Sequence, residues 1–177
     1  ERRTKIEAEI ESITINMESL IASEDTIVTV TKDGYVKRTS LRSYTASNGK
    51  DFGMKDSDRL LCQYEMNTTD VLLLFTNKGN YLYCPVHELP DIRWKDIGQH
   101  ISRTIPIDQD ERIVQGIPLK SFDDEKFFLF VTKKGMVKKT EIRQYKAQRY
   151  SKPLVAINLK DDDEVVAVHI TDGTGLI

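Results

Sequence analysis

The sequence has few cysteines and no long apolar stretch. Its two cysteines, Cys62 and Cys84, are too few for a secreted disulfide framework and too far apart for a CxxC motif, so we expect free thiols in a reducing compartment. The longest apolar runs, Val71 to Phe75 and Phe127 to Val131, are far shorter than the roughly 20 residues of a membrane-spanning helix. The chain opens in a charged run without an initiator Met or a signal-type segment, and it ends on the apolar pair Leu176-Ile177, so we expect both ends to be cuts within a longer protein. From the cysteines we expect that protein to be cytoplasmic.

Signatures of catalysis and of metal binding are also missing. The three histidines, His87, His100 and His169, have no partners at zinc-ligand spacing. The chain has neither a Walker-type phosphate loop nor a G-x-S-x-G elbow. The acidic run from Asp161 to Glu164 has counterparts before other strands, which favours a turn over a cation site. We therefore expect no catalytic residue, no metal and no cofactor in this chain.

Charge is nearly balanced overall but unevenly distributed. The 26 Lys and Arg residues against 28 Asp and Glu give a net charge of −2, which argues weakly against a nucleic-acid partner. Between Thr132 and Arg149, however, seven basic residues occur with one acidic residue, Glu141, whereas Asp161 to Glu164 is entirely acidic. This segregation along the chain leaves nucleic-acid binding open.

A repeat organises the chain. An apolar segment, the sequence Thr-x-x-Gly and an alternating segment recur near residues 27–44, 71–89 and 127–145. The glycines Gly34, Gly79 and Gly135 are 45 and 56 residues apart, which is the scale of one propeller blade. Each copy predicts an antiparallel hairpin with a tight turn at its glycine.

A second element precedes each hairpin. An acidic residue stands two positions before an apolar residue or pair at Glu11, Asp58, Glu111 and Asp163, and we expect a strand to begin there each time. The one helical candidate, Arg2 to Ile10, is expected to be the end of a linking helix over residues 1–12 that arrives from an upstream domain. The fold class is therefore all-β, with about three propeller-like blades over residues 13–177, ending at the start of the next blade.

The turns and the strands after them resemble a known family. Residues Thr31 to Arg38 (TKDGYVKR) and Thr132 to Lys139 (TKKGMVKK) are similar to the blade motif of the C-terminal domains of gyrase and topoisomerase IV A subunits. Leu41 to Ser47 and His87 to Gly98 resemble the topoisomerase IV branch of this family in Gram-positive bacteria. The likeness covers essentially the whole chain.

Gyrase A subunits carry a glycine-rich basic box, QRRGGKG, after the first hairpin. The corresponding stretch here, Ser47 to Gly53, keeps little of it beyond Gly49 and Lys50. Within the family, this departure points to decatenation and relaxation of DNA and away from the introduction of negative supercoils.

The resemblance implies a β-pinwheel, a propeller-like ring whose neighbouring blades exchange strands and whose basic rim bends double-stranded DNA. It implies that catalysis lies elsewhere, in an ATP-dependent type IIA topoisomerase that uses ATP and Mg. In that holoenzyme, the remainder of the A subunit would form a heterotetramer with the ATPase B subunit. This chain would present duplex DNA to the core of the enzyme during chromosome segregation.

Basic residues that recur in the repeat are candidates for phosphate contacts, because each phosphate neutralised by Lys or Arg releases counterions. Alternation along the strand places Lys37 and Arg38 on opposite faces, so that one of the two can face outward. The middle copy has Leu82 and Tyr83 there, and the loop after it is expected to supply its charge instead. The candidate DNA-binding residues are Lys32, Lys37, Arg38, Arg42, Lys50, Arg93, Lys95, Arg103, Lys133, Lys134, Lys138, Lys139, Arg143, Lys146 and Arg149.

Other interpretations stay open. The same lysines fit a solvated face that protects strand edges from pairing. Trp94, between Arg93 and Lys95, fits packing against a neighbouring blade better than stacking on a base, since duplex bases are not exposed. The repeat also fits a gyrase A C-terminal domain or a protein-interaction propeller, because fold does not settle function. An independent hydrolase would need an acid/base or metal cluster, which the sequence does not show.

Overall fold

Short strands dominate residues 21–173, the part of the chain that this computed structural model describes. The first six strands are β1 (Asp25–Thr31), β2 (Tyr35–Ser40), β3 (Leu60–Asn67), β4 (Val71–Thr76), β5 (Asn80–Pro85) and β6 (Gln99–His100). The others are β7 (Ile113–Leu119), β8 (Phe127–Thr132), β9 (Val137–Glu141), β10 (Leu154–Val155) and β11 (Val165–Thr171). The helices are α2 (Leu41–Ala46) and the 3-10 turns η1 (Val86–Glu88), η2 (Ile101–Arg103) and η3 (Ile142–Tyr145).

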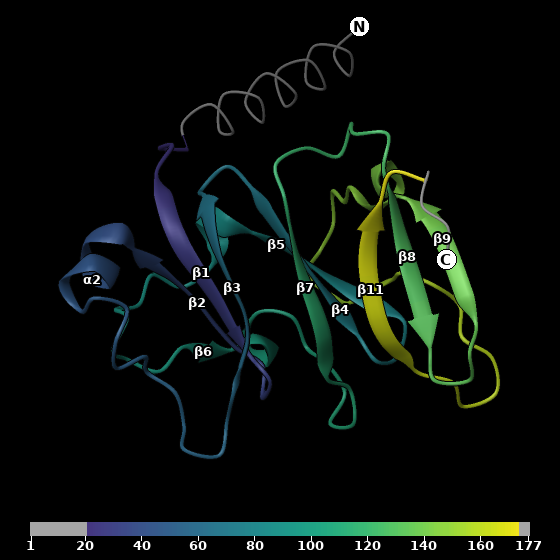
Figure 1. The fold of residues 1–177 in the computed structure, drawn as a ribbon, viewed down its shortest axis with the longest axis horizontal. Coiled ribbons are helices and arrows are strands. Elements are labelled where there is room, and N and C mark those ends of the chain that lie inside the picture. The colour runs from purple at the N-terminus through teal and green to yellow at the C-terminus, as the bar shows by residue number, and fades with distance from the viewer. Residues whose placement is uncertain (1–20, 174–177) are drawn as a thin grey trace, which may run out of the picture.

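The strands form three antiparallel sheets that stand in a row (Figure 1). The strand orders are β3-β1-β2-β6, β10-β5-β4-β7 and β11-β8-β9. The predicted all-β blade array is therefore confirmed. The helix expected at Arg2 to Ile10 and the strand expected after Glu11 lie outside the described residues.

Each sheet contains one hairpin. The pairs β1–β2, β4–β5 and β8–β9 are antiparallel, and the residue pairs that enclose the turns are Val30 with Val36, Phe75 with Tyr81, and Val131 with Val137. The three repeat glycines lie in these turns with positive φ, the left-handed conformation that glycine adopts without a Cβ clash. The three predicted hairpins are confirmed.

The recurrent acidic residues hold the hairpin turns. Strands β3, β7 and β11 begin where the acidic residues predicted them and pair with β1, β4 and β8. The Asp58 carboxylate accepts hydrogen bonds from the backbone N–H of Asp33 (3.0 Å) and of Arg59 (2.7 Å). Asp163 accepts in the same way from Lys134 (3.0 Å) and Glu164 (2.9 Å). The turn interpretation of these acidic residues is thereby confirmed.

Neighbouring blades exchange short strands. Strand β6 follows the second hairpin in sequence but pairs with β2 of the first sheet. Strand β10 follows the third hairpin but pairs with β5 of the second sheet. This is the exchange that the family resemblance implied, and it carries the chain after each hairpin back onto the preceding blade.

Apolar side chains fill the two spaces between the sheets. Leu72, Leu74 and Leu82 belong to the core shared with the first sheet, and Leu73 and Phe75 to the core shared with the third. The second sheet is thus buried on both faces, as its nearly continuous apolar run VLLLF indicates. The same burial explains why Leu82 and Tyr83 replace the basic pair of the other copies, since both side chains lie in core clusters.

Helix α2 was not predicted, because its segment was taken as the end of the first hairpin. The Ser40 hydroxyl caps it by accepting from the Ser43 N–H (3.1 Å), and none of its six residues is buried. A helix of this length shows no apolar period in the sequence. Within residues 21–173, no helix is both long and apolar enough to span a bilayer.

Candidate nucleic-acid interface

Most of the candidate residues are accessible to a ligand. Thirteen of the fifteen are exposed, and the exceptions are Lys37 and Arg38. The exposed ones are Lys32, Arg42, Lys50, Arg93, Lys95, Arg103, Lys133, Lys134, Lys138, Lys139, Arg143, Lys146 and Arg149.

Lys37 is a correction to the predicted site. Its side chain is 1% exposed, and its Nζ donates to the backbone carbonyls of Arg93 (3.1 Å), Trp94 (2.8 Å) and Asp96. Burial lowers the pKa of Lys37 to about 8, although the Asp96 carboxylate acts in the opposite direction. Alternation did place Lys37 and Arg38 on opposite faces, but a loop from far along the chain covers the face of Lys37. Lys37 therefore cannot contact a phosphate in this conformation.

That loop, residues 89–98, lies along β2. Arg38 donates its backbone N–H to Pro90 O (2.9 Å) and its Nε to Leu89 O (2.9 Å), and its own carbonyl accepts from Ile92 N–H (3.0 Å). Arg38 is half-buried as a result. The loop was expected to add charge to the second blade, whereas it adds the exposed Arg93 and Lys95 to the first.

The degenerate box packs against the same loop. The Phe52 and Tyr44 rings each have their centroid 4.8 Å from that of Trp94, and the Gly53 N–H donates to Trp94 O (2.9 Å). Trp94 is 3% exposed, so its predicted packing role is confirmed. Phe52 was not predicted to be a functional residue. The only feature of the sequence that could have indicated its role is that Phe52 is a single aromatic residue in a polar, glycine-containing loop.

Strand β9 presents the second group of basic residues. Lys138 and Lys139 are exposed and lie opposite Phe130 and Leu129 of β8, on the two faces of the edge strand. The Lys139 ammonium lies 4.7 Å from the centre of the Phe127 ring. Among the described residues, no carboxylate lies within ion-pair distance of either lysine, whereas the neighbouring Arg143 pairs with Glu141 at 2.5 Å. The two lysines therefore keep their charge available.

The lysines of the third turn have acidic residues beside them in space, although basic and acidic residues are segregated along the chain. The Lys133 N–H donates to Glu164 O (2.8 Å), and the Lys134 ammonium donates to Asp161 O. Pairing of β11 with β8 brings the acidic run beside this turn. The carboxylate of Asp163, which accepts from the Lys134 N–H at 3.0 Å, therefore partly offsets the positive potential at Lys134.

The two basic groups lie at opposite ends of the row of sheets. Figure 1 shows α2, at the start of the segment that leads to the box, at one end and β9 at the other. We name the exposed Arg42, Lys50, Arg93 and Lys95 the first-blade surface, and Lys138, Lys139, Arg143 and Lys146 the β9 surface. A ligand that contacts both surfaces must extend along the long axis of the molecule.

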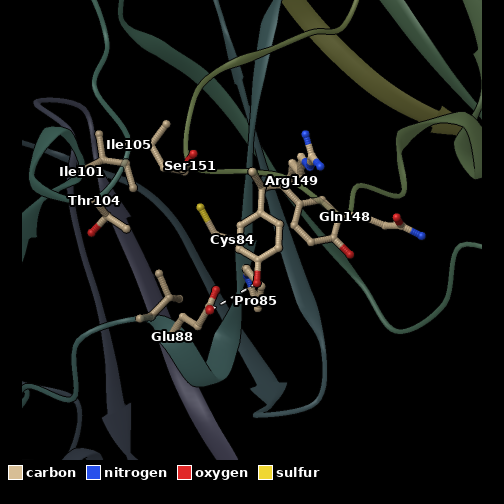
Figure 2. Close-up of a pocket in the computed structure, with 12 residues that line it drawn as sticks. Cys84, Pro85, Glu88, Ile101, Thr104, Ile105, Gln148, Arg149 and Ser151 are labelled. Atoms are coloured by element: carbon tan, nitrogen blue, oxygen red, sulfur yellow. Dashed lines mark hydrogen bonds between the residues drawn. The ribbon is translucent and has the colours of Figure 1, made fainter. Parts of the chain in front are cut away.

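Arg149 lines a cavity of about 650 Å³ (Figure 2). The cavity is mainly apolar, and the Tyr150 hydroxyl donates to Glu88 across its wall (3.1 Å). Cys84 also lines it, and burial raises the pKa of this thiol to about 12, so the thiol stays protonated and is a poor nucleophile. In the described part of the chain, no cluster of His, Cys, Asp or Glu side chains is arranged to hold a metal ion.

Comparison with known families accounts for this arrangement of blades. The model of the DNA gyrase C-terminal domain, a beta-propeller, matches residues 25–50, 70–120 and 126–172, which include strands of all three sheets. The chain belongs to the DNA gyrase C-terminal domain family. Each matched segment contains one of the three hairpins, so the family's blades correspond to the repeat found in the sequence.

Relatives in the DNA gyrase C-terminal domain family include topoisomerase IV A subunits. The chain is 68% identical over 176 residues to the A subunit of DNA topoisomerase 4 from Bacillus subtilis (strain 168), covering 99% of this chain and 22% of that protein. It is 48% identical over 168 residues to the corresponding protein of Staphylococcus aureus (strain MRSA252), covering 95% of this chain and 21% of that protein. The chain thus spans about a fifth of the length of these curated relatives.

Solved structures of the family agree with the fold. The crystal structure of the C-terminal domain of DNA topoisomerase IV matches with a TM-score of 0.83 and 75% identity, covering 87% of this chain and 48% of that one. The DNA gyrase A C-terminal domain matches with a TM-score of 0.59 and 26% identity, covering 84% and 48%. The two scores place this chain nearer to the topoisomerase IV domain in structure as well as in sequence.

Proposed function

We propose that this domain is the DNA-binding part of a topoisomerase IV A subunit, in which it holds duplex DNA through phosphate contacts. The observation that carries the proposal is the pair Lys138 and Lys139, which are exposed and have no carboxylate partner among the described residues. Phosphate contacts from such side chains supply most of the sequence-independent affinity for DNA. The topoisomerase IV relatives support the same assignment.

The contacts are proposed to fix the path of the duplex without reading its bases. The only α-helix among the described residues is the six-residue α2, too short for a recognition helix in the major groove. Bending 20 to 30 base pairs by 40–90° costs on the order of 1–6 kcal/mol, so many simultaneous contacts are needed to offset it. Basic surfaces at both ends of the row provide contacts along the length of a bent duplex.

Catalysis is proposed to belong to the rest of the enzyme. This chain would present DNA to the type IIA core during decatenation and relaxation, while ATP, Mg and the ATPase B subunit would act outside it. The proposed location is the cytoplasm, with the chromosome. The free thiols Cys62 and Cys84 are consistent with such a reducing compartment.

The test measures binding of the chain to a duplex of about 40 base pairs across a salt series, because the slope of log K against log salt changes by about 0.9 for each phosphate contact. We expect a steep slope. In a variant carrying Lys138→Gln and Lys139→Gln, the slope should fall by about 1.8.

The matched control is Lys78→Gln. Lys78 is also exposed near a hairpin turn, but its ammonium is paired with Asp110 at 2.6 Å, so its loss should leave the slope unchanged. If the double variant binds DNA with the parent slope, the β9 surface is not a DNA site. If the parent itself shows no binding at low salt, a protein-interaction role replaces the proposed function.

A further inference from the structure

Lys37 has three hydrogen-bond donors and three backbone acceptors. A lysine ammonium has three N–H groups and accepts no hydrogen bond. Here the acceptors are the carbonyls of Arg93, Trp94 and Asp96, all within four consecutive residues of one loop. A single side chain on β2 thereby binds the backbone of a segment 56 to 59 residues downstream.

The same ammonium also contacts the loop that follows α2. It lies 4.5 Å from the centre of the Phe52 ring and 5.9 Å from that of Trp94, within the range of cation–π attraction. Gly53 packs so closely that a Cβ there would lie 2.2 Å from the carbonyl carbon of Asp96. Residues 47–53 and 89–98 therefore meet at Lys37.

The equivalent position of the second blade carries no charge. Lys37 stands three residues after the turn glycine, where the second blade has Leu82, and Leu82 is completely buried in the apolar core. The repeat therefore does not fix a charge at this position. Burying an ammonium is costly unless its hydrogen bonds are satisfied, and what the ammonium adds here is the attachment of residues 93–96.

The attached segment alternates inward and outward. Trp94 is buried between Tyr44 and Phe52, while Arg93 and Lys95 on either side of it are exposed. Arg93 pairs with Asp96 at 2.9 Å, but both side chains are largely in water, where such pairs are weak, and the guanidinium keeps further N–H donors for a phosphate. A backbone conformation that buries Trp94 therefore keeps the side chains of Arg93 and Lys95 exposed to solvent.

We propose that Lys37 is a positioning residue that fixes residues 93–96 so that Arg93 and Lys95, together with Lys50 of the neighbouring loop, act as one phosphate-binding surface. The inference rests on the proposed DNA binding. Lys37 itself makes no contact with DNA and acts only through the two loops.

The experiment is a mutant cycle on the 177-residue chain, read as the slope of log K against log salt for the same duplex. Arg93→Gln with Lys95→Gln should lower the slope by about 1.8, since two contacts are lost. Lys37→Met should produce a similar reduction although it removes no exposed charge. Combining all three substitutions should lower the slope no further than either set alone.

The control is the β9 surface, at the other end of the row. Lys138→Gln with Lys139→Gln should lower the slope by its full amount in both the parent and the Lys37→Met chain, because Lys37 does not contact that surface. Trp94, the single tryptophan, reports on the junction, and its quenching by acrylamide should increase in Lys37→Met while the far-ultraviolet circular dichroism stays native. If Lys37→Met loses the native circular dichroism spectrum, Lys37→Gln replaces it, because the glutamine amide keeps two N–H donors. The same salt slopes are then measured with Lys37→Gln.

Two outcomes separate the inference from the proposed function. If Arg93→Gln with Lys95→Gln lowers the slope while a folded Lys37 variant keeps the parent value, Lys37 is not a positioning residue but DNA binding stands. The conclusion would be the same if the slope changes caused by Lys37→Met and by Arg93→Gln with Lys95→Gln added up fully in the combined variant. If no variant at either surface changes DNA binding, the proposed function fails as a whole.

Discussion

At the scale of single residues, Lys37 has an unusual proton affinity. Its ammonium is removed from water, and the loss of hydration lowers its pKa from 10.5 to about 8. The carbonyls that surround it, and the carboxylate of Asp96, offset this loss only in part. The folded chain therefore releases this proton at a lower pH than the unfolded chain does.

The consequence is a stability that rises with pH in this window. Between about pH 8 and 10.5 the unfolded state binds more protons at Lys37, so this group makes the free energy of unfolding increase with pH. Urea denaturation under reducing conditions should show the free energy of unfolding increase from about pH 7 to about pH 9. The Lys37→Met chain should lack this increase. The measurement stops at about pH 9 because burial raises the pKa of Cys62 and Cys84 from 9.0 to about 12. At higher pH the unfolded chain loses these thiol protons while the folded chain keeps them, which lowers the free energy of unfolding. Identical pH dependence in the two chains would show that Lys37 is not the source.

The half-buried Arg38 also changes what a charge reversal would test. Because its Nε and its backbone both bind residues 89–92, Arg38→Glu would disturb that loop as well as remove a charge. The exposed Lys138 gives the cleaner charge substitution.

At the scale of elements, the hairpin turns differ in what packs on them. Gly34 and Gly135 have similar φ values, +95° and +87°. A Cβ on Gly34 would lie 3.1 Å from the His100 ring of the exchanged strand β6, while a Cβ on Gly135 would meet nothing within 4 Å. The first turn is therefore covered by the following blade, and the third is open among the described residues.

This difference predicts unequal costs for the same substitution. Gly34→Ala and Gly135→Ala should each lose about 1–2 kcal/mol of unfolding free energy from left-handed backbone strain. Gly34→Ala should lose more, since the His100 ring, whose Nε2 lies 2.8 Å from Asp33 O, must also shift. Urea denaturation of the two variants checks the order. An equal or larger loss for Gly135→Ala would mean that the exchanged strand does not pack on the first turn.

At the scale of the whole molecule, the second sheet holds the row together, because both of its faces are buried. The Phe75 ring lies 5.0 Å from Phe128 and 5.4 Å from Phe130, centre to centre, across the space between the second and third sheets. On the other face, Leu72 and Leu74 pack toward the first sheet. The two cores thus share one sheet, which should make the blades unfold together.

Phe75→Ala tests this coupling. Removing a buried phenylalanine typically costs about 3–5 kcal/mol. The urea midpoint should fall by the same amount in circular dichroism and in the fluorescence of Trp94, although Trp94 packs against Tyr44 of the first blade. A Trp94 transition that stays at the parent urea midpoint would show that the first blade unfolds independently.

Much of the fold was predictable because it depends on local chemistry. The glycines at 34, 79 and 135 mark the turns, since a tight turn with positive φ favours glycine whatever surrounds it. Apolar alternation and the acidic residues before β3, β7 and β11 marked the strands. The sequence by itself therefore determined three hairpins and their order.

Only the tertiary structure decided which basic side chains are buried and which have acidic residues beside them. Lys37 fits the basic repeat pattern, yet residues 93–96, from a later segment of the chain, enclose its side chain. Lys134 lies beside Asp161 because β11 pairs with β8. In both cases a segment distant in sequence supplies the environment. Burial and charge neutralisation depend on neighbours in space, and a repeat pattern specifies only neighbours along the chain.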